Sequence, residues 1–175
     1  MNEQPNRDGR IHQGRWTAEV SEPLVVFLIG MRVNKPWKAR HWWWVAAAMP
    51  RMLRKLAEDP ELGLLHVQGF TQGRTTLSLQ YWRSFDHLER FARGPDLPHL
   101  KAWRRWNREI RDSGDVGIWH ETYTVGPGSV EAIYGNMPPF GLAAATALVP
   151  VGTLGHAAGH RLDRQRADVT PVRPY

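Results

Sequence analysis

The most constraining feature of the sequence is the segment Pro23–Val33, PLVVFLIGMRV, which is apolar at almost every position. Successive side chains of a β-strand point to opposite faces of its sheet. In this segment both alternating sets are apolar, which is typical of a central strand that is covered on both sides. The fold must therefore supply two apolar layers for this one strand.

The segments that follow predict an alternation of helices and strands. After Pro23–Val33 come a helical segment at 34–59 that Pro50 breaks or kinks, strands at 63–71 and 74–82 joined at Gln72-Gly73, a short helix between Ser84 and Gly94-Pro95, a helix over about Leu97–Asp112, and a strand over Val116–Val125. The order β-α-β-β-α-β is ferredoxin-like. We therefore predict an α+β fold, in which an antiparallel sheet carries its helices on one face.

This arrangement leaves the second face of the sheet without helices. The two-faced apolar strand requires a cover there, and the simplest cover is the same face of a second copy of the chain. We therefore predict a homodimer in which two sheets form a dimeric α+β barrel.

The pattern along the chain divides it into three parts. Residues 1–21 are polar and predict a flexible N-terminal lead-in. Residues 22–142 hold the ferredoxin-like domain, which ends with a further short strand around Val130–Tyr134. Residues 143–175 form a C-terminal extension, and its Arg- and Pro-rich end is expected to be partly disordered.

Composition excludes several classes of site. The 175 residues include no cysteine, which rules out disulfides, thiolate metal sites and Cys-ligated haem.

The longest apolar run, Phe140–Gly155, is interrupted by Pro150 and is too short for a transmembrane segment. The polar first residues do not form a signal peptide, so we expect a cytoplasmic protein. The net charge of +6 comes from scattered residues without a nucleic-acid-binding motif, so we expect no nucleic-acid partner.

Two histidines are the candidate catalytic and metal-ligating residues. His99 falls on one stripe of its helix with Trp103 and Trp106, and His120 shares a strand face with Ile118. Two imidazoles could thus approach one pocket, one from a helix and one from the sheet. A haem between helices and sheet would use one as the iron ligand and place the other above its opposite face. The alternative is a histidine satisfied within the core, which is the commoner role.

Two other features leave alternatives open. Arg83 follows a strand end and either pairs with a haem propionate or an acidic substrate, or lies on the surface. In the string HWWW, His41–Trp44, the three Trp point in too many directions to share one core. One or more of these rings lines a pocket, packs under the C-terminal extension or touches a membrane surface. Ordinary packing with one exposed ring is the alternative.

The segments YWRSFDHLERFARGPDLPHLKAW, VGIWHETY and EAIYGNMPPFGL resemble the monooxygenase-like family, which is named for a polyketide monooxygenase of fumagillin biosynthesis. The resemblance covers about Val25 to Leu142, and WHETY and YGNMPP are its most specific parts. It implies a dimeric α+β barrel and a monooxygenase-like activity.

A more distant resemblance is to the haem-dependent aldoxime dehydratases. Late in their chains these enzymes have a Pro-x-His-type helix start followed by a His-Glu-Val strand, and Pro98-His99 and His120-Glu121 stand at a similar separation here. The resemblance implies His99 as the haem-iron ligand and His120 as the distal acid–base catalyst. We include Trp103 and Arg83 among the candidate haem-binding residues. Those enzymes contain a fused pair of ferredoxin-like halves, whereas this chain has one.

Several functions remain open at this point. The first is a haem-binding monooxygenase-like or dehydratase-like enzyme that acts on a small apolar organic substrate. Its cofactor-independent counterpart would use Trp and Tyr rings to hold a substrate whose own electrons activate oxygen. The others are a non-catalytic protein that binds haem or a hydrophobic ligand, and a protein that associates with membranes through its Trp cluster. An enzyme and a binding protein need the same pocket, so the sequence does not separate them.

Overall fold

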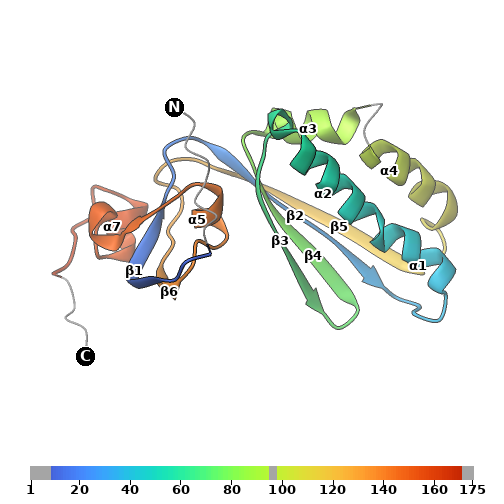
Figure 1. The fold of residues 1–175 in the computed structure, drawn as a ribbon, viewed down its shortest axis with the longest axis horizontal. Helices are drawn as coiled ribbons and strands as arrows, with labels where there is room; N and C mark the ends of the chain where they lie inside the picture. Colours follow the sequence, from blue (N-terminus) through green and yellow to red (C-terminus); the bar gives the residue numbers. More distant parts are fainter. Residues whose placement is uncertain (1–8, 95–97, 171–175) are drawn as a thin grey trace. The chain divides into compact units, whose positions relative to one another are not determined.

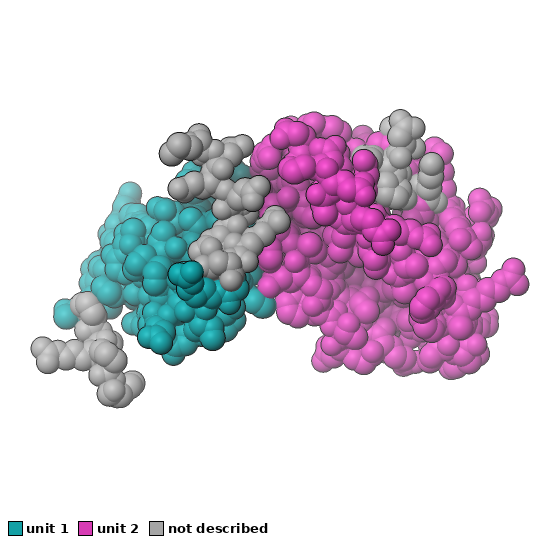
Figure 2. All heavy atoms as spheres, in the orientation of Figure 1, with its two compact units in different colours: residues 1–24, 124–175 teal, residues 25–123 magenta. Residues whose placement is uncertain are grey.

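The computed structural model describes residues 9–94 and 98–170. The chain divides into two compact units, one of residues 25–123 and one that combines residues 1–24 with 124–175 (Figures 1 and 2). Each unit has a sheet of its own.

Residues 25–123 carry a four-stranded sheet in the order β3-β4-β2-β5. The strands are β2 (Leu24–Val33), β3 (Leu64–Gln72), β4 (Thr75–Trp82) and β5 (Val116–Val125). β2 runs antiparallel to β4, with Leu28 opposite Leu79, and β3 forms a hairpin with β4. The turn of this hairpin contains Gly73, whose φ of 56° suits glycine best. The apolar strand of the sequence is thus an internal strand, as predicted.

Helices cover one face of this sheet (Figure 1). They are α1 (Ala39–Ala46), α2 (Ala48–Glu58), the 3-10 turn η1 (Pro60–Leu62), α3 (Phe85–Arg93) and α4 (Pro98–Glu109). α1 and α2 meet at Ala47, because the Pro50 ring clashes with the carbonyl four residues earlier and ends the first helix there. Ser84 caps α3, and its Oγ accepts a hydrogen bond from the His87 backbone N–H at 3.3 Å. The element order confirms the α+β ferredoxin-like class.

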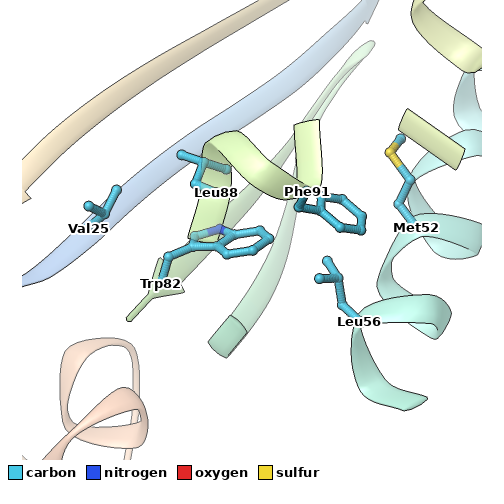
Figure 3. Close-up of a cluster of buried hydrophobic side chains, with 6 residues drawn as sticks. All are labelled: Val25, Met52, Leu56, Trp82, Leu88 and Phe91. Atoms are coloured by element: carbon cyan, nitrogen blue, oxygen red, sulfur yellow. The ribbon is translucent and has the colours of Figure 1, made fainter. Parts of the chain in front are cut away.

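The core of this unit lies between the sheet and the helices, in two clusters. The first, shown in Figure 3, joins strands β2 and β4 to helices α2 and α3 through Val25, Met52, Leu56, Trp82, Leu88 and Phe91. The second contains Met31, Ile110 and Val116, with Trp42, Trp44 and Trp106 packed against it. The three Trp of the HWWW string therefore have different environments: Trp43 is 68% exposed, while its two neighbours pack against the core.

Strand β4 turns its polar side toward the helices. Gln80 and Trp82 are buried, and the Gln80 side chain contacts Met49 of α2. The alternate residues of the strand point to the opposite face of the sheet: Leu77, Leu79 and Tyr81. Within residues 25–123, no described helix covers that second face (Figure 1).

The other unit holds a three-stranded sheet in the order β6-β1-β7. It consists of β1 (His12–Glu19), β6 (Tyr134–Met137), α5 (Leu142–Ala145), β7 (Ala147–Pro150), α6 (Val151–Leu154) and α7 (Ala158–Leu162). β1 lies in the segment for which the sequence predicts a flexible lead-in. The short strand predicted around Val130–Tyr134 begins only at Tyr134, where pairing with Trp16 of β1 starts. The prediction of that strand is therefore wrong by four residues, since its partner strand was not foreseen.

One buried ion pair holds this second unit together. The Arg161 side chain, 4% exposed, pairs with Glu131 and also donates to the backbone carbonyls of Gly155 and His156, each at 2.9 Å. The bond to Glu131 ties α7 to the segment before β6, and the bonds to Gly155 and His156 hold the turn that leads into α7. The domain limits at 22–142 and 143–175 stay predictions.

Candidate active site

His120 lies on the face of β5 that the helices cover. The alternation of the strand places it with Val116, which is buried, and Ile118, which packs against the second core cluster. His120 itself is exposed, and its ring centroid is 5.6 Å from that of Phe27 on β2. Among the described residues, no hydrogen bond reaches its imidazole. The ring is therefore supported on one side by an aromatic neighbour and remains open to solvent.

Phe27 connects His120 to a small cavity between the sheet and helices α2 and α3. The cavity has a volume of about 30 Å³ and a mostly apolar wall: Phe27, Ile29, Met49, Met52, Leu56, Gln80, Trp82, Leu88, Phe91 and Ala92. This volume accommodates roughly one or two water molecules. The imidazole thus borders the wall of an apolar space within the core.

Gln80 is the polar group of that cavity, and sequence reasoning did not single it out. Its Oε1 accepts the Trp82 indole N–H at 3.0 Å, and its Nε2 donates to Ser78 Oγ at 3.2 Å. Its second N–H donates to Met49 Sδ at 3.6 Å, so both donors of the amide are engaged. The amide oxygen can accept a second hydrogen bond, and this is the capacity that remains for a ligand. The sequence shows only that Gln80 is a polar residue in a predicted strand. It does not show which face of that strand is buried.

The other predicted site residues lie elsewhere in the unit. Trp103 of α4 is 45% exposed and stacks on Trp106, with ring centroids 5.4 Å apart and planes 13° from parallel. The stripe predicted from the spacing of Trp103 and Trp106 is present, with the Trp103 ring at the surface. His99 lies in the first turn of α4, but its side chain is outside what the structure describes.

Arg83 follows β4 directly. Its backbone N–H donates to the Gly63 carbonyl at 2.8 Å, and its Nη1 lies 3.8 Å from Glu61 Oε2. Its side chain is 47% exposed. Among the described side chains, no hydrogen bond, ion pair or ring contact joins Arg83 or Trp103 to His120. Their grouping into one haem site stays a prediction.

The strongest electrostatic cluster of the unit surrounds Asp115, just before β5. The carboxylate is 1% exposed and contacts Lys35 Nζ at 2.7 Å, Lys38 Nζ at 3.0 Å and His41 Nδ1 at 2.6 Å. Hydrogen bonding from Lys35, and then from Lys38 and His41, holds the pKa of Asp115 well below its usual range. The cluster ties the start of β5 to α1 and so fixes the strand that carries His120. Sequence reasoning missed it, because its members are far apart in the chain and Asp115 reads as a loop residue.

The opposite face of β5 carries a second polar pair. The Tyr123 hydroxyl donates a short hydrogen bond to Glu121 Oε2, and this bond raises the pKa of Tyr123. Alternation separates the pair from His120. Glu121 therefore cannot orient the imidazole within one chain.

The described residues do not fit a haem as they stand. Pockets for cofactors and drug-sized ligands are roughly 300–1,000 Å³, whereas the cavity beside Phe27 has about 30 Å³. Its wall contains no cationic side chain for a propionate. Among the described residues, no group of three or more His, Asp or Glu side chains is placed to hold a metal ion. Within the same part of the chain, no helix has both the length and the apolar character needed to cross a bilayer.

Two solved structures are similar to the chain at low TM-scores. The cofactor-independent oxygenase SnoaB from Streptomyces nogalater has a TM-score of 0.41 at 16% identity, covering 60% of this chain and 94% of its own. An aldoxime dehydratase, OxdRE, in complex with butyraldoxime has a TM-score of 0.45 at 13% identity, covering 83% of this chain and 45% of its own.

Sequence relatives carry more information. Monooxygenase af470 from Aspergillus fumigatus is 32% identical over 143 residues, which is 77% of this chain. The chain spans about half the length of that relative, 49%. The model of the family described as monooxygenase af470-like matches residues 24–142, a span that includes β2 to β6 and the candidate site. The chain therefore belongs to the monooxygenase af470-like family.

Proposed function

We propose that the protein is a monooxygenase-type enzyme that acts on a small apolar organic substrate, with His120 as its acid–base group. The observation that carries the proposal is the position of the His120 ring, on the helix-covered face and against Phe27, a wall residue of the apolar cavity. An imidazole has an unperturbed pKa near 6.5 and exchanges protons close to neutrality. A strand also holds it more rigidly than a loop would.

The lining of the cavity supports an apolar substrate with one polar anchor. Phe27 and Trp82 offer aromatic surface, and the Gln80 amide oxygen can accept a hydrogen bond from a substrate hydroxyl. The space must enlarge to admit a substrate. Met49 and Met52 are the side chains suited to move, because methionine is unbranched and adapts to irregular shapes.

The reaction class that needs no further reductant is oxidation of an activated methylene to a ketone. His120 takes a proton from the C–H bond, and the resulting carbanion gives its electrons to O₂ and forms a C–O bond. Loss of the second C–H proton then breaks the O–O bond. One oxygen atom stays as the ketone and the other leaves as water, so CH₂ and O₂ become C=O and H₂O in balance.

A haem enzyme is the second candidate. It is favoured by the position of His99 in the first turn of α4, together with His120 on the helix-covered face of β5. The present cavity is too small for the group, so haem binding requires the helices to separate from the sheet. In this candidate His99 would hold the iron, Trp103 and Arg83 would border the cofactor, and the haem would supply the redox chemistry.

Two measurements distinguish the candidates. The protein is purified from haem-supplemented culture, and its visible spectrum is recorded beside that of His99→Ala. A Soret band that disappears in the variant supports the haem enzyme. Without a Soret band, oxygen uptake is measured with phenolic ketones that carry an activated methylene and with no added cofactor. Uptake that depends on His120 supports the first candidate, and absence of both signals contradicts both.

We also propose that the working form is a homodimer. The second face of the four-stranded sheet carries Val26, Leu28, Leu77, Leu79 and Trp119, an apolar set that a second copy would cover. A dimer formed there would bring the Glu121–Tyr123 pairs of both copies to the interface.

A further inference from the structure

We propose that the outer surface of helices α1 and α2 binds an anionic lipid bilayer. This surface, the Trp–Arg face, consists of Trp37 before α1, Arg40 and Trp43 on α1, and Arg51 and Arg54 on α2. All five side chains are exposed. The protein would lie on the bilayer surface without crossing it.

The aromatic part of this face is unusually open to solvent. Trp37 is 75% exposed and Trp43 68%, the highest values among the large apolar side chains of the described residues. The two are linked through Trp42, which stacks edge-on against Trp43 at 6.0 Å between centroids and donates its indole N–H to the Pro36 carbonyl at 2.9 Å. Exposure of two neighbouring indole rings to water is unfavourable, whereas indole rings are enriched at the headgroup level of a bilayer.

The charge of the face is positive up to the last residue of α2, Glu58, which pairs with Lys55 at 3.9 Å. Residues 34–57 contain six Lys and Arg and no Asp or Glu, although the whole chain has 17 acidic residues. Arg40 and Trp43 are neighbours on α1, and Arg51 and Arg54 are neighbours on α2, because each pair is three residues apart. Asp115 offsets part of the charge of Lys35 and Lys38 at one edge. The three arginines keep the centre of the face cationic.

The orientation of the helices leaves this face free for a partner. The inner side of α2 buries Met52 and Leu56 in the core, and the inner side of α1 packs Trp42 and Trp44 there. The core therefore occupies the apolar side of both helices, and contact with a bilayer would be made by the two exposed indoles and the three arginines. A duplex nucleic acid or an acidic protein would be attracted by the arginines but offers no apolar layer to take up two projecting indoles.

The test is cosedimentation of the full chain with vesicles of phosphatidylcholine alone and with vesicles that also contain phosphatidylserine. We expect binding only to the anionic vesicles, with a blue shift of Trp fluorescence. Trp37→Ser with Trp43→Ser should lower the partition coefficient by roughly tenfold or more, because the protein loses both rings that would enter the bilayer interface. Arg51→Gln with Arg54→Gln should lower it by about twenty-five-fold, since each charge near the surface contributes about fivefold.

Controls keep the test specific. Phe85→Ser removes an exposed ring from α3, 47% exposed, and Arg90→Gln removes a cation from the same helix; both should bind as the unmodified protein does. Circular dichroism establishes that each variant is folded. The proposal is overturned if anionic vesicles are not bound at low salt, or if the Trp variant binds them as well as the parent. Two results together would instead identify a general polyanion site: heparin binding that depends on the arginines, and lipid binding that does not change when Trp37 and Trp43 are replaced.

Discussion

His120 and His87 show two different uses of a histidine in one unit. The His87 ring is half-buried, and its Nδ1 lies 2.7 Å from Ser84 Oγ, so it stabilises the start of α3. His120 is exposed, contacts Phe27, and has no hydrogen bond within the described residues. A group that packs is paired in the folded state, whereas a group that transfers protons must remain accessible to a substrate.

This contrast gives a matched pair of variants. We expect His120→Gln to lower activity by about 10²–10⁴-fold with little change in melting temperature, because glutamine keeps hydrogen bonding but cannot shuttle protons. His87→Gln should lower the melting temperature while activity per folded molecule is kept. Thermal denaturation and oxygen uptake on the same samples check both. Normal turnover by His120→Gln would eliminate the catalytic role.

Asp115 predicts how stability depends on pH. The pKa of Asp115 is lowered in the folded state. Its contribution to the free energy of unfolding is therefore present at pH values above its unfolded pKa of about 3.9, and it is lost as the pH falls through the folded pKa. We expect Asp115→Asn to lower the urea midpoint at pH 7, because Lys35, Lys38 and His41 lose their shared partner. The difference in urea midpoint between Asp115→Asn and the unmodified protein should narrow as the pH falls below about 4.

The control for Asp115 is Asp112→Asn. Asp112 pairs with Arg111, but its side chain is 82% exposed, so its removal should leave the midpoint nearly unchanged. A gap for Asp115→Asn that stays constant down to acid pH would show that packing, rather than charge, sets the effect.

At the scale of the element, strand β4 has an unexpected orientation. Its polar residues Ser78 and Gln80 lie under the helices together with Trp82. The apolar residues Leu77, Leu79 and Tyr81 point to the other face. The buried polar groups satisfy one another, because the amide of Gln80 bonds both Ser78 and Trp82. A polar group in an otherwise apolar layer is costly unless it is paired, and it is a candidate for binding a ligand.

A pair of identical substitutions on two strands tests this orientation. Gln80→Met should lower the free energy of unfolding by about 1–3 kcal/mol, because the indole N–H of Trp82, 1% exposed, loses its acceptor. Gln68→Met on β3 should be neutral or stabilising, since among the described residues the buried Gln68 Oε1 has no partner. Urea denaturation measures both. Equal effects of the two changes would show that the hydrogen bonds of Gln80 do not matter.

At the scale of the whole molecule, the second face of the four-stranded sheet predicts the assembly. Leu28 and Leu79 are opposite one another on that face, at its centre. We expect the protein to be a dimer by size-exclusion chromatography with light scattering. Leu79→Glu should convert it to a folded monomer, because two charges would be buried together without partners.

The control places the same charge on the helix side. Phe85→Glu on α3 lies outside the proposed interface and should remain dimeric. A wild-type protein that stays monomeric at micromolar concentration, or a Leu79→Glu protein that remains a dimer, contradicts the barrel arrangement.

Local features of the sequence determined the order of elements and several of their ends. Pro50 divides the first helical segment, Gly73 takes the turn conformation that other residues disfavour, and Ser84 caps α3. The alternation of Val116–Val125 places His120 on the same side as Ile118. Each of these outcomes depends on residues within a turn or two of one another, so the sequence pattern is sufficient.

Only the tertiary structure decided which faces meet. Strand β2 is apolar on both sides, so the pattern could not tell whether β4 presents Leu79 or Gln80 to the helices. The cluster around Asp115 joins residues more than 70 positions apart, which no local pattern reveals. β1 was not predicted, because its pairing with β6 and β7 links the two ends of the chain. Contacts between distant segments form only when the chain has folded, and therefore they lie beyond what neighbouring residues can specify.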